Sequence, residues 1–176
     1  MPIVIPNMAS LAGLSGQSYS INAPALTAGM GPGNAAETGR AVTAAGDLEQ
    51  AAREADLISC ATLSKQPLVQ GAWLKPGAHL DLVGAFTPEM RESDDEAVRR
   101  ASVFVDTREG ALKEAGDIVL AVKSGALTPD AIRGDLYDLT RGAAKGRQSA
   151  EEITFFKSVG TALEDLAAAQ LAYSRT

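Results

Sequence analysis

The sequence is poor in the residues that build disulfide frameworks and zinc sites. It contains one cysteine, Cys60, and one histidine, His79, among 176 residues. A single thiol cannot form an internal disulfide, which argues against a small secreted scaffold. Zinc sites combine several Cys or His ligands at characteristic spacings, and His79 has no partner at such a spacing. We therefore expect no metal site.

Long apolar runs and an excess of positive charge are also missing. No run of about 18 apolar residues is present that would span a membrane. The amino terminus, MPIVIPNMAS, contains Pro2 and Pro6 and lacks the basic region of a signal peptide. The 16 Lys and Arg residues are scattered among 22 Asp and Glu, and the net charge of -6 would repel a phosphate backbone. We therefore expect a cytoplasmic protein that binds neither membranes nor nucleic acids.

What the sequence does contain is an alternation of short apolar runs and helical segments. With 45% apolar side chains, the chain is long enough for one domain with a hydrophobic core. Residues 57–61, 79–83 and 102–106 are apolar runs bounded by polar or turn-forming residues, which predicts buried strands. Residues 47–55 and 88–101 have helical character, and Thr87 before Pro88 is typical of a helix start. This alternation predicts an α/β fold with a parallel sheet.

The residues just after these predicted strands are the first candidates for a binding site. In an open parallel sheet, ligands bind beyond the carboxyl ends of the strands. Those positions hold Thr62, then Val83, Gly84 and Ala85, then Thr107. Most of these side chains are small or carry a hydroxyl, which would leave room for a flat ligand against the backbone. For Gly84 alone, a simple strand end explains the residue equally well.

The carboxyl-terminal part predicts a second structural unit. The segments starting at Ser149 and at Thr161 both have the form of a capping box. A helix over residues 161–174 would bring several apolar and small side chains onto one face suited to close packing, namely Leu163, Leu166, Ala167, Gln170 and Leu171. Residues 157–160 then lie at its entrance, where amide groups and the Ser158 hydroxyl would meet a ligand. A plain cap and turn is an equal alternative.

The remaining candidates favour structural interpretations. Cys60 lies inside a predicted strand, and nothing near it in sequence would lower its pKa, so we expect a buried structural thiol. The acidic run at residues 89–96 fits no calcium loop, and a solvated helix face explains it better. Trp73 precedes a Pro-Gly turn signal at residues 76–77 and is predicted to anchor the turn into the next strand.

Two stretches carry a resemblance to a known family. Residues 56–118, with the loop GAFTPEMRE, and residues 149–173, with the tail FKSVGTALEDLAAA, resemble the second half of the ornithine cyclodeaminase and mu-crystallin family. The resemblance covers residues from about 41 to the carboxyl terminus. It implies a Rossmann-like domain that binds NAD(H) or NADP(H). It also implies a lobe, built from both chain ends, that holds an imino or amino acid substrate and forms a homodimer.

The resemblance assigns roles to particular residues and segments. Thr62, Val83, Gly84 and Ala85 match cofactor contacts, Ser158 matches a contact near the nicotinamide, and Val159 is expected to bind substrate. Residues 1–40 form an unmatched segment, and residues 41–125 form a partial Rossmann-like domain. Residues 126–176 are expected to return to the lobe for substrate and dimerisation.

One departure from the family pattern separates two branches. Ornithine cyclodeaminases carry glycine-glycine-aspartate after the second of these strands, and the aspartate is their catalytic acid/base, whereas this sequence has Gly84, Ala85 and Phe86. A positioned acid/base typically contributes about 10²–10⁴-fold to a rate. The GAFTPEMRE form resembles the ketimine reductases of the family, which reduce Δ1-pyrroline-2-carboxylate or Δ1-piperideine-2-carboxylate to proline or pipecolate. The alternatives are a cyclodeaminase-type lyase and a truncated, non-catalytic protein that binds a ligand or dimerises.

A second departure concerns the amino-terminal half of the family. Its substrate-binding arginine and lysine, and the glycine-rich turn that receives the pyrophosphate, have no counterpart before residue 41. The glycines at residues 29–33 have the wrong spacing for that turn, and Pro32 removes a backbone donor. We therefore expect a truncated or rearranged member whose own activity stays open. The choice between NADH and NADPH is equally open, because the residues near the ribose fall in the unmatched region.

Overall fold

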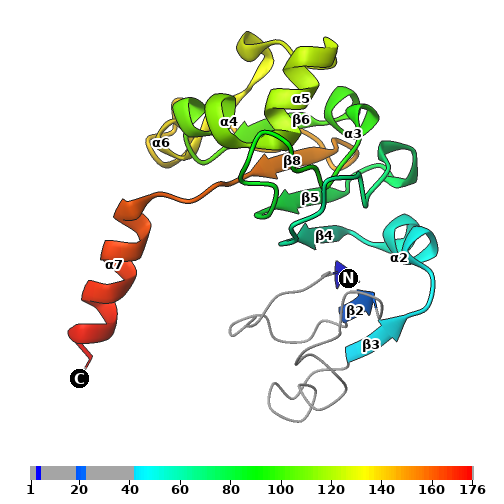
Figure 1. Cartoon of the computed structure of the whole chain (residues 1–176), viewed down its shortest axis with the longest axis horizontal. Helices are drawn as coiled ribbons and strands as arrows, with labels where there is room; N and C mark the ends of the chain where they lie inside the picture. Colours follow the sequence, from blue (N-terminus) through cyan, green and yellow to red (C-terminus); the bar gives the residue numbers. More distant parts are fainter. Residues whose placement is uncertain (1–2, 5–18, 23–41, 176) are drawn as a thin grey trace.

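The computed structural model describes residues 3–4, 19–22 and 42–175 (Figure 1). Within these residues, eight strands form one sheet in the order β3-β2-β1-β4-β5-β8-β6-β7. All of their pairings are parallel. The strands are β1 (Ile3–Val4), β2 (Tyr19–Asn22), β3 (Val42–Ala45), β4 (Leu57–Cys60), β5 (His79–Leu82), β6 (Ser102–Val105), β7 (Gly134–Asp135) and β8 (Thr154–Lys157).

Six α-helices and two short 3₁₀ helices connect and flank these strands in the described part of the chain. They are α2 (Leu48–Glu54), η2 (Gly71–Trp73), α3 (Asp95–Arg100), α4 (Arg108–Glu114), α5 (Gly116–Ser124), η3 (Pro129–Ala131), α6 (Leu136–Thr140) and α7 (Ala162–Tyr173). None of these helices is long and apolar enough to cross a membrane. The predicted α/β class, the three predicted strands and the helix near residues 47–55 are confirmed.

The hydrophobic core is formed by residues of the central strands together with residues of α3 and α5, which lie near these strands in Figure 1. Leu80 and Leu82 of β5 and Phe155 of β8 are fully buried. Ile118 of α5 belongs to the same core, and Trp73 packs against it. The Lys75 carbonyl accepts from the Ala78 amide at 3.1 Å, which closes the turn that Trp73 was predicted to anchor. The apolar runs of the sequence therefore form this core because alternate residues of adjacent strands face the helices.

The helix predicted over residues 88–101 is wrong in its first half. Residues 87–90 form a turn in which the Met90 amide donates to the Thr87 carbonyl at 3.0 Å, so Thr87 does not cap a helix. Helix α3 begins only at Asp95, and the Asp94 side chain accepts from the Ala97 amide at 2.9 Å. Between the two, the amides of residues 92 and 93 donate to the carboxylate of Asp117. A distant side chain therefore takes the donors that a continuous helix would use internally.

The first capping box predicted in the tail is also wrong. The Glu152 amide donates to the Ser149 hydroxyl at 3.1 Å, as in a cap, but no helix follows. Instead the chain forms β8, which the sequence analysis did not predict and which pairs with β5 on one side and β6 on the other. The sheet thus takes two strands, β7 and β8, from beyond residue 125. The aromatic and β-branched residues of β8 suit a position buried between two strands.

The predicted carboxyl-terminal helix is confirmed as α7, with Thr161 at its N-cap position. The predicted capping bond is wrong, because the Thr161 side chain makes no hydrogen bond to the first turn. The helix stands apart from the sheet (Figure 1), and none of its residues is buried. Leu163, Leu166 and Leu171 are more than half exposed, at 62%, 53% and 53%. The apolar face of α7 is therefore uncovered in a single chain.

Candidate functional site

The candidate site is the edge of the sheet formed by the carboxyl ends of four neighbouring strands. Strands β4, β5, β8 and β6 lie next to one another in this order and run parallel. The segments that follow them start at residues 61, 83, 158 and 106. This edge therefore brings together the segments with every residue that the family resemblance assigned to cofactor or substrate.

Thr62 and the segment after β5 are in direct contact. The Ala85 amide donates to the Thr62 carbonyl at 3.3 Å, and the Val83 amide donates to the Cys60 carbonyl at 2.7 Å. The Thr62 hydroxyl accepts from the Ser64 amide at 3.2 Å. The expected contacts after β4 and β5 thus form one connected layer of backbone.

Gly84 and Ala85 face the protein itself. An ideal Cβ on Gly84 would lie 2.2 Å from the Thr62 carbonyl oxygen and 2.4 Å from Glu92 Oε1. Ala85 is fully buried and has a left-handed backbone, with φ of 49°. Val83 and Phe86 are 40% and 46% exposed on either side of them. The expectation that small residues here make room for a flat ligand therefore needs correction: they make room for backbone, and a ligand at this edge would meet Val83 and Phe86.

Ser158 and Val159 are half-buried beside this layer. The Ser158 hydroxyl, expected to be available to a ligand, donates to Asp106 Oδ2 at 3.2 Å. The amides of Val159 and Gly160 donate to the same oxygen at 2.8 and 2.9 Å. Asp106 was not among the predicted site residues, and its only signal in the sequence is its place as the last residue of a predicted strand. Asp106 therefore holds the Ser158 hydroxyl and the two amides in a fixed orientation at the edge.

A buried lysine joins the ends of β5 and β8. Lys157 is fully buried, and its Nζ donates to the carbonyls of Leu82 at 3.1 Å, Ser158 at 2.9 Å and Gly84. Burial lowers the pKa of Lys157, against the opposing effect of Asp117 and other nearby carboxylates. Gly84 lies within the expected cofactor segment, residues 83–85, and Leu82 lies directly before it. Lys157 therefore connects the segment after β5 to Ser158.

Two buried carboxylates, those of Glu92 and Asp117, hold the backbone next to the segment after β4. Glu92 Oε1 accepts from the Thr62 amide at 2.6 Å, and Asp117 Oδ1 accepts from the amides of Glu92 and Ser93 at 3.0 and 2.9 Å. Burial raises the pKa of both carboxyl groups. Part of the acidic run at residues 89–96 is therefore not a solvated helix face, because Glu92 is fully buried. The Glu92 carboxylate fixes the position of Thr62 through the hydrogen bond from the Thr62 amide.

The other candidates of the sequence analysis have structural partners. The Thr107 hydroxyl accepts from the Gly110 amide at 3.3 Å as the cap of α4, and β8 separates it from β5. Cys60 is a buried free thiol, and burial raises its pKa, as expected for a structural cysteine. His79 Nδ1 lies 2.7 Å from Thr154 Oγ1, and burial lowers the pKa of its imidazole. Within residues 42–175 no cluster of His, Cys, Asp or Glu is arranged to hold a metal ion.

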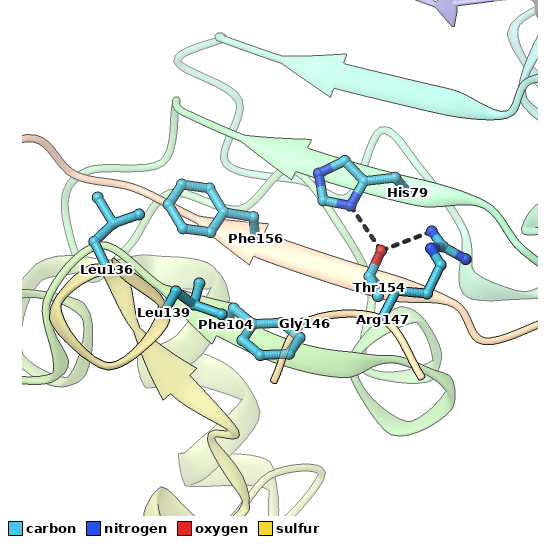
Figure 2. A pocket seen from close by; sticks show the side chains of 8 residues that line it. All are labelled: His79, Phe104, Leu136, Leu139, Gly146, Arg147, Thr154 and Phe156. Atoms are coloured by element: carbon cyan, nitrogen blue, oxygen red, sulfur yellow. Dashed lines mark hydrogen bonds between the residues drawn. The ribbon is translucent and has the colours of Figure 1, made fainter. Parts of the chain in front are cut away.

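A cavity of about 400 Å³ lies on the sheet face rather than at its edge. Figure 2 shows Thr154 joined to His79 and Arg147, with the rings of Phe104 and Phe156 beside them. His79 and Thr154 are the first residues of β5 and β8. The cavity thus starts at the amino-terminal ends of β5 and β8. Leu136, which also lines it, donates its amide to the Asp106 carbonyl at 3.2 Å, so the cavity reaches the residues that follow β6. The glycines at residues 29–33, whose spacing does not match the pyrophosphate-binding turn of the family, lie outside the residues that the structure describes.

A parallel sheet with a polar, backbone-rich edge at its carboxyl ends defines a Rossmann-like nucleotide-binding class. The chain belongs to the ornithine cyclodeaminase/mu-crystallin family, whose model matches residues 29–176. It is 49% identical over 125 residues to a Δ1-pyrroline-2-carboxylate reductase of Paracoccus denitrificans, covering 71% of this chain and 40% of that protein. It is 44% identical over 126 residues to the mouse ketimine reductase mu-crystallin, covering 72% and 37%.

Solved structures agree with this assignment. The Thermococcus litoralis Δ1-pyrroline-2-carboxylate reductase in complex with NADH and L-proline has a TM-score of 0.78 at 32% identity, covering 90% of this chain and 49% of that one. An archaeal alanine dehydrogenase dimer with bound NAD has a TM-score of 0.78 at 28% identity, covering 90% and 48%. The chain thus spans half or less of the length of these relatives.

Proposed function

We propose that this chain forms the nicotinamide-binding part of an NAD(P)H-dependent ketimine reductase. Its substrate would be a cyclic imino acid, Δ1-pyrroline-2-carboxylate or Δ1-piperideine-2-carboxylate, and its product proline or pipecolate. The observation that carries the proposal is the identity of 49% and 44% to two reductases named for such chemistry. The family match over residues 29–176 includes the whole strand edge, from Thr62 to Val159.

The residues of the edge fit the nicotinamide end of the cofactor. Val83 and Phe86 offer exposed apolar surface for a flat ring, and Ser158 offers a half-buried hydroxyl next to it in the sheet order. Thr62, Gly84 and Ala85 would support this surface through their backbone contacts. When bound, the dihydronicotinamide would supply a hydride to the carbon of the substrate C=N bond. We expect Val159 to face the substrate, because it follows Ser158 directly.

The chemistry of the edge favours reduction over cyclising deamination. Reduction adds one hydride to the imine carbon and one proton to its nitrogen, so positioning matters more than a strong base. Cyclodeamination needs an acid/base carboxylate, and the position where the family resemblance places one holds Phe86. Phe86 is half exposed at the edge, where an apolar ring would help exclude water from the reacting carbon.

We also propose that α7 mediates formation of a homodimer. The helix has three leucines that are more than half exposed on a surface of small residues. A cluster of exposed apolar side chains on one helix is typical of an interaction surface. The alanine dehydrogenase relative, described as a dimer, supports a symmetric assembly of this kind.

The proposed activity is tested by turnover. Purified protein would be mixed with Δ1-pyrroline-2-carboxylate or Δ1-piperideine-2-carboxylate and either NADH or NADPH, while loss of the reduced nicotinamide absorbance and formation of proline or pipecolate are followed. The proposal expects equal amounts of cofactor consumed and proline or pipecolate formed, and the faster cofactor identifies the natural one. Saturable cofactor binding without any proline or pipecolate would contradict the reductase and support a binding protein.

A further inference from the structure

The peptide group between Ser158 and Val159 lies between two buried charged side chains. Its carbonyl oxygen accepts from Lys157 Nζ at 2.9 Å, and its N–H donates to Asp106 Oδ2 at 2.8 Å. Lys157 is 0% exposed and Asp106 is 1% exposed. A cation thus binds one end of the peptide dipole and an anion binds the other. This arrangement fixes the plane of that peptide.

The ammonium group of Lys157 donates to carbonyl oxygens rather than to a carboxylate. An ammonium group has three protons, and its three acceptors here are the carbonyls of Leu82, Gly84 and Ser158. None of the ion pairs within the described part of the chain includes Lys157. The Leu82 carbonyl also accepts from the Ser158 amide at 3.0 Å. Lys157 therefore locks together the two segments that carry the expected cofactor contacts.

Asp106 completes the same arrangement from the end of β6. Its Oδ1 accepts from the Thr107 amide at 2.6 Å, while Oδ2 accepts from the Ser158 hydroxyl and from the amides of Val159 and Gly160. One buried carboxylate thus orders three consecutive residues after β8. Without it, these donors would lack their common acceptor.

Stability alone does not explain two buried charges at this position. Replacing buried ionic groups by well-packed apolar residues is often neutral or stabilising, because each charge must leave water. What the charges provide is one defined orientation of the backbone at Ser158 and Val159. That orientation matters only if these residues contact something outside the chain.

We propose that Lys157 and Asp106 are positioning residues that hold Ser158, Val159 and the segment after β5 in the conformation that binds the nicotinamide cofactor. This inference rests on the proposed function. If the binding conformation is only fractionally populated, the apparent dissociation constant rises in proportion. Losing either charged group would therefore weaken cofactor binding without removing any atom that touches the cofactor.

The first experiment compares the dissociation constant for NADH among variants at a temperature well below unfolding. If Asp106→Ala or Lys157→Met leaves the binding conformation populated about one tenth of the time, the dissociation constant rises about tenfold. Asp106→Asn keeps one acceptor oxygen for the amides of Val159 and Gly160 but turns an NH2 group towards the Thr107 amide, so it should recover only part of the affinity. The control is Asp94→Ala, which removes an aspartate that accepts from the amides of Gly71 and Ala97, neither of which belongs to the four segments of the edge. An unchanged constant for both Asp106→Ala and Lys157→Met would overturn the proposal.

A second measurement separates this inference from the proposed function. Amide hydrogen exchange of the protein without cofactor would be followed at Val159 and Gly160, and at residues 95–100 of α3. We expect Asp106→Ala to speed exchange at Val159 and Gly160 only, and Asp94→Ala to speed it in α3 only. If wild-type protein binds no NADH but shows this local effect, the proposed function fails and the ordering role stands. Equal exchange in wild type and Asp106→Ala sinks the ordering role itself.

Discussion

Gly84 is enclosed by backbone and side chain on two sides. The Thr62 carbonyl and amide and Glu92 Oε1 would all lie within 2.4 Å of a Cβ at this position. None of these groups can move freely, because Glu92 Oε1 already binds the Thr62 amide at 2.6 Å. Glycine is therefore needed here for packing between the connections that follow β4 and β5.

Gly84→Ala should lower the stability of the protein by about 1–3 kcal/mol, as overpacking typically does. The free energy of unfolding would be measured by urea denaturation. Gly46→Ala is the matched control, because a Cβ there would meet nothing within 4 Å. Equal stability of Gly84→Ala and Gly46→Ala would show that the loop can rearrange.

Glu92 predicts a pH dependence of stability. Burial raises its pKa above the ordinary value of 4.5, so the folded state holds the proton more tightly than the unfolded state. The contribution of Glu92 is therefore fully present below pH 4.5 and is lost as the pH rises through the folded pKa. Glu92→Gln keeps an acceptor for the Thr62 amide but cannot ionise.

The stability of Glu92→Gln relative to wild type should therefore increase as the pH rises above 4.5. Urea denaturation of both proteins across a series of pH values would measure this difference. Glu92→Ala, which leaves the Thr62 amide without its carboxylate, serves as the comparison and should be less stable than Glu92→Gln at every pH. A difference between Glu92→Gln and wild type that does not vary with pH would contradict the burial of an ionisable acid.

Helix α3 and the 3₁₀ helix η2 pack backbone against backbone. A Cβ on Gly71 would lie 2.1 Å from the Ala97 amide nitrogen, and Asp94 Oδ1 accepts from both the Gly71 and the Ala97 amides, at 2.8 and 2.9 Å. One carboxylate therefore caps α3 and joins it to η2. Asp47 occupies the same N-cap position in α2, and among the residues that the structure describes its side chain accepts from the Gln50 amide alone, at 3.2 Å.

Asp94→Ala should cost more stability than Asp47→Ala, because it removes an inter-element bond as well as a cap. Loss of an N-cap typically costs about 0.5–2 kcal/mol, and we expect Asp47→Ala near the lower end of this range. Urea denaturation of the two variants would compare them directly. Equal losses would mean that the bond to Gly71 adds nothing.

Strands β4, β5 and β6 could be predicted from local sequence, whereas β7 and β8 could not. The runs at 57–61, 79–83 and 102–106 are apolar and bounded by turn signals, so their period and length identify them. The β8 run is short, ends in Lys157 and follows a sequence that imitates a helix cap. Lys157 can be buried because its ammonium group donates to the carbonyls of Leu82 and Gly84, which lie 75 and 73 positions earlier in the chain. No local pattern contains that information.

The candidate site divides in the same way. Thr62 and Val83 could be placed at one edge, because parallel strands end on the same side of a sheet. Ser158 was marked by the family motif alone, because β8 before it was not predicted. Asp106, Glu92 and Asp117 could not be recognised, because their partners lie far away in sequence. From the sequence alone, Glu92 was interpreted as part of a solvated acidic helix face. Charged residues buried by tertiary contacts are thus the part that sequence patterns miss.

The chain as a whole combines a covered sheet face with an uncovered helix. Helices α3 and α5 cover one face of the sheet, whereas α7 stands apart with its leucines exposed (Figure 1). The part of this chain that aligns with the curated relatives covers only 37–40% of their length. We propose that α7 of one chain meets its counterpart in a dimer, and that this contact covers the exposed leucines.

Leu166→Asp would place a charge in the middle of that contact and should shift the protein from dimer to monomer. Sedimentation velocity across a range of concentrations would measure the shift. Leu112→Asp changes a partly exposed leucine of α4 and should leave the dimer intact. A wild-type protein that stays monomeric at all concentrations, or a Leu166→Asp protein that stays dimeric, would contradict the role of α7.

The central claim is that the strand edge binds a nicotinamide cofactor, and direct titration tests it best. Purified protein would be titrated with NADH and, separately, NADPH while nicotinamide fluorescence is followed. We expect saturable binding at micromolar concentrations of one of them, weakened in Asp106→Ala and unchanged in Asp94→Ala. The absence of saturable binding up to millimolar concentrations of either cofactor would contradict the account.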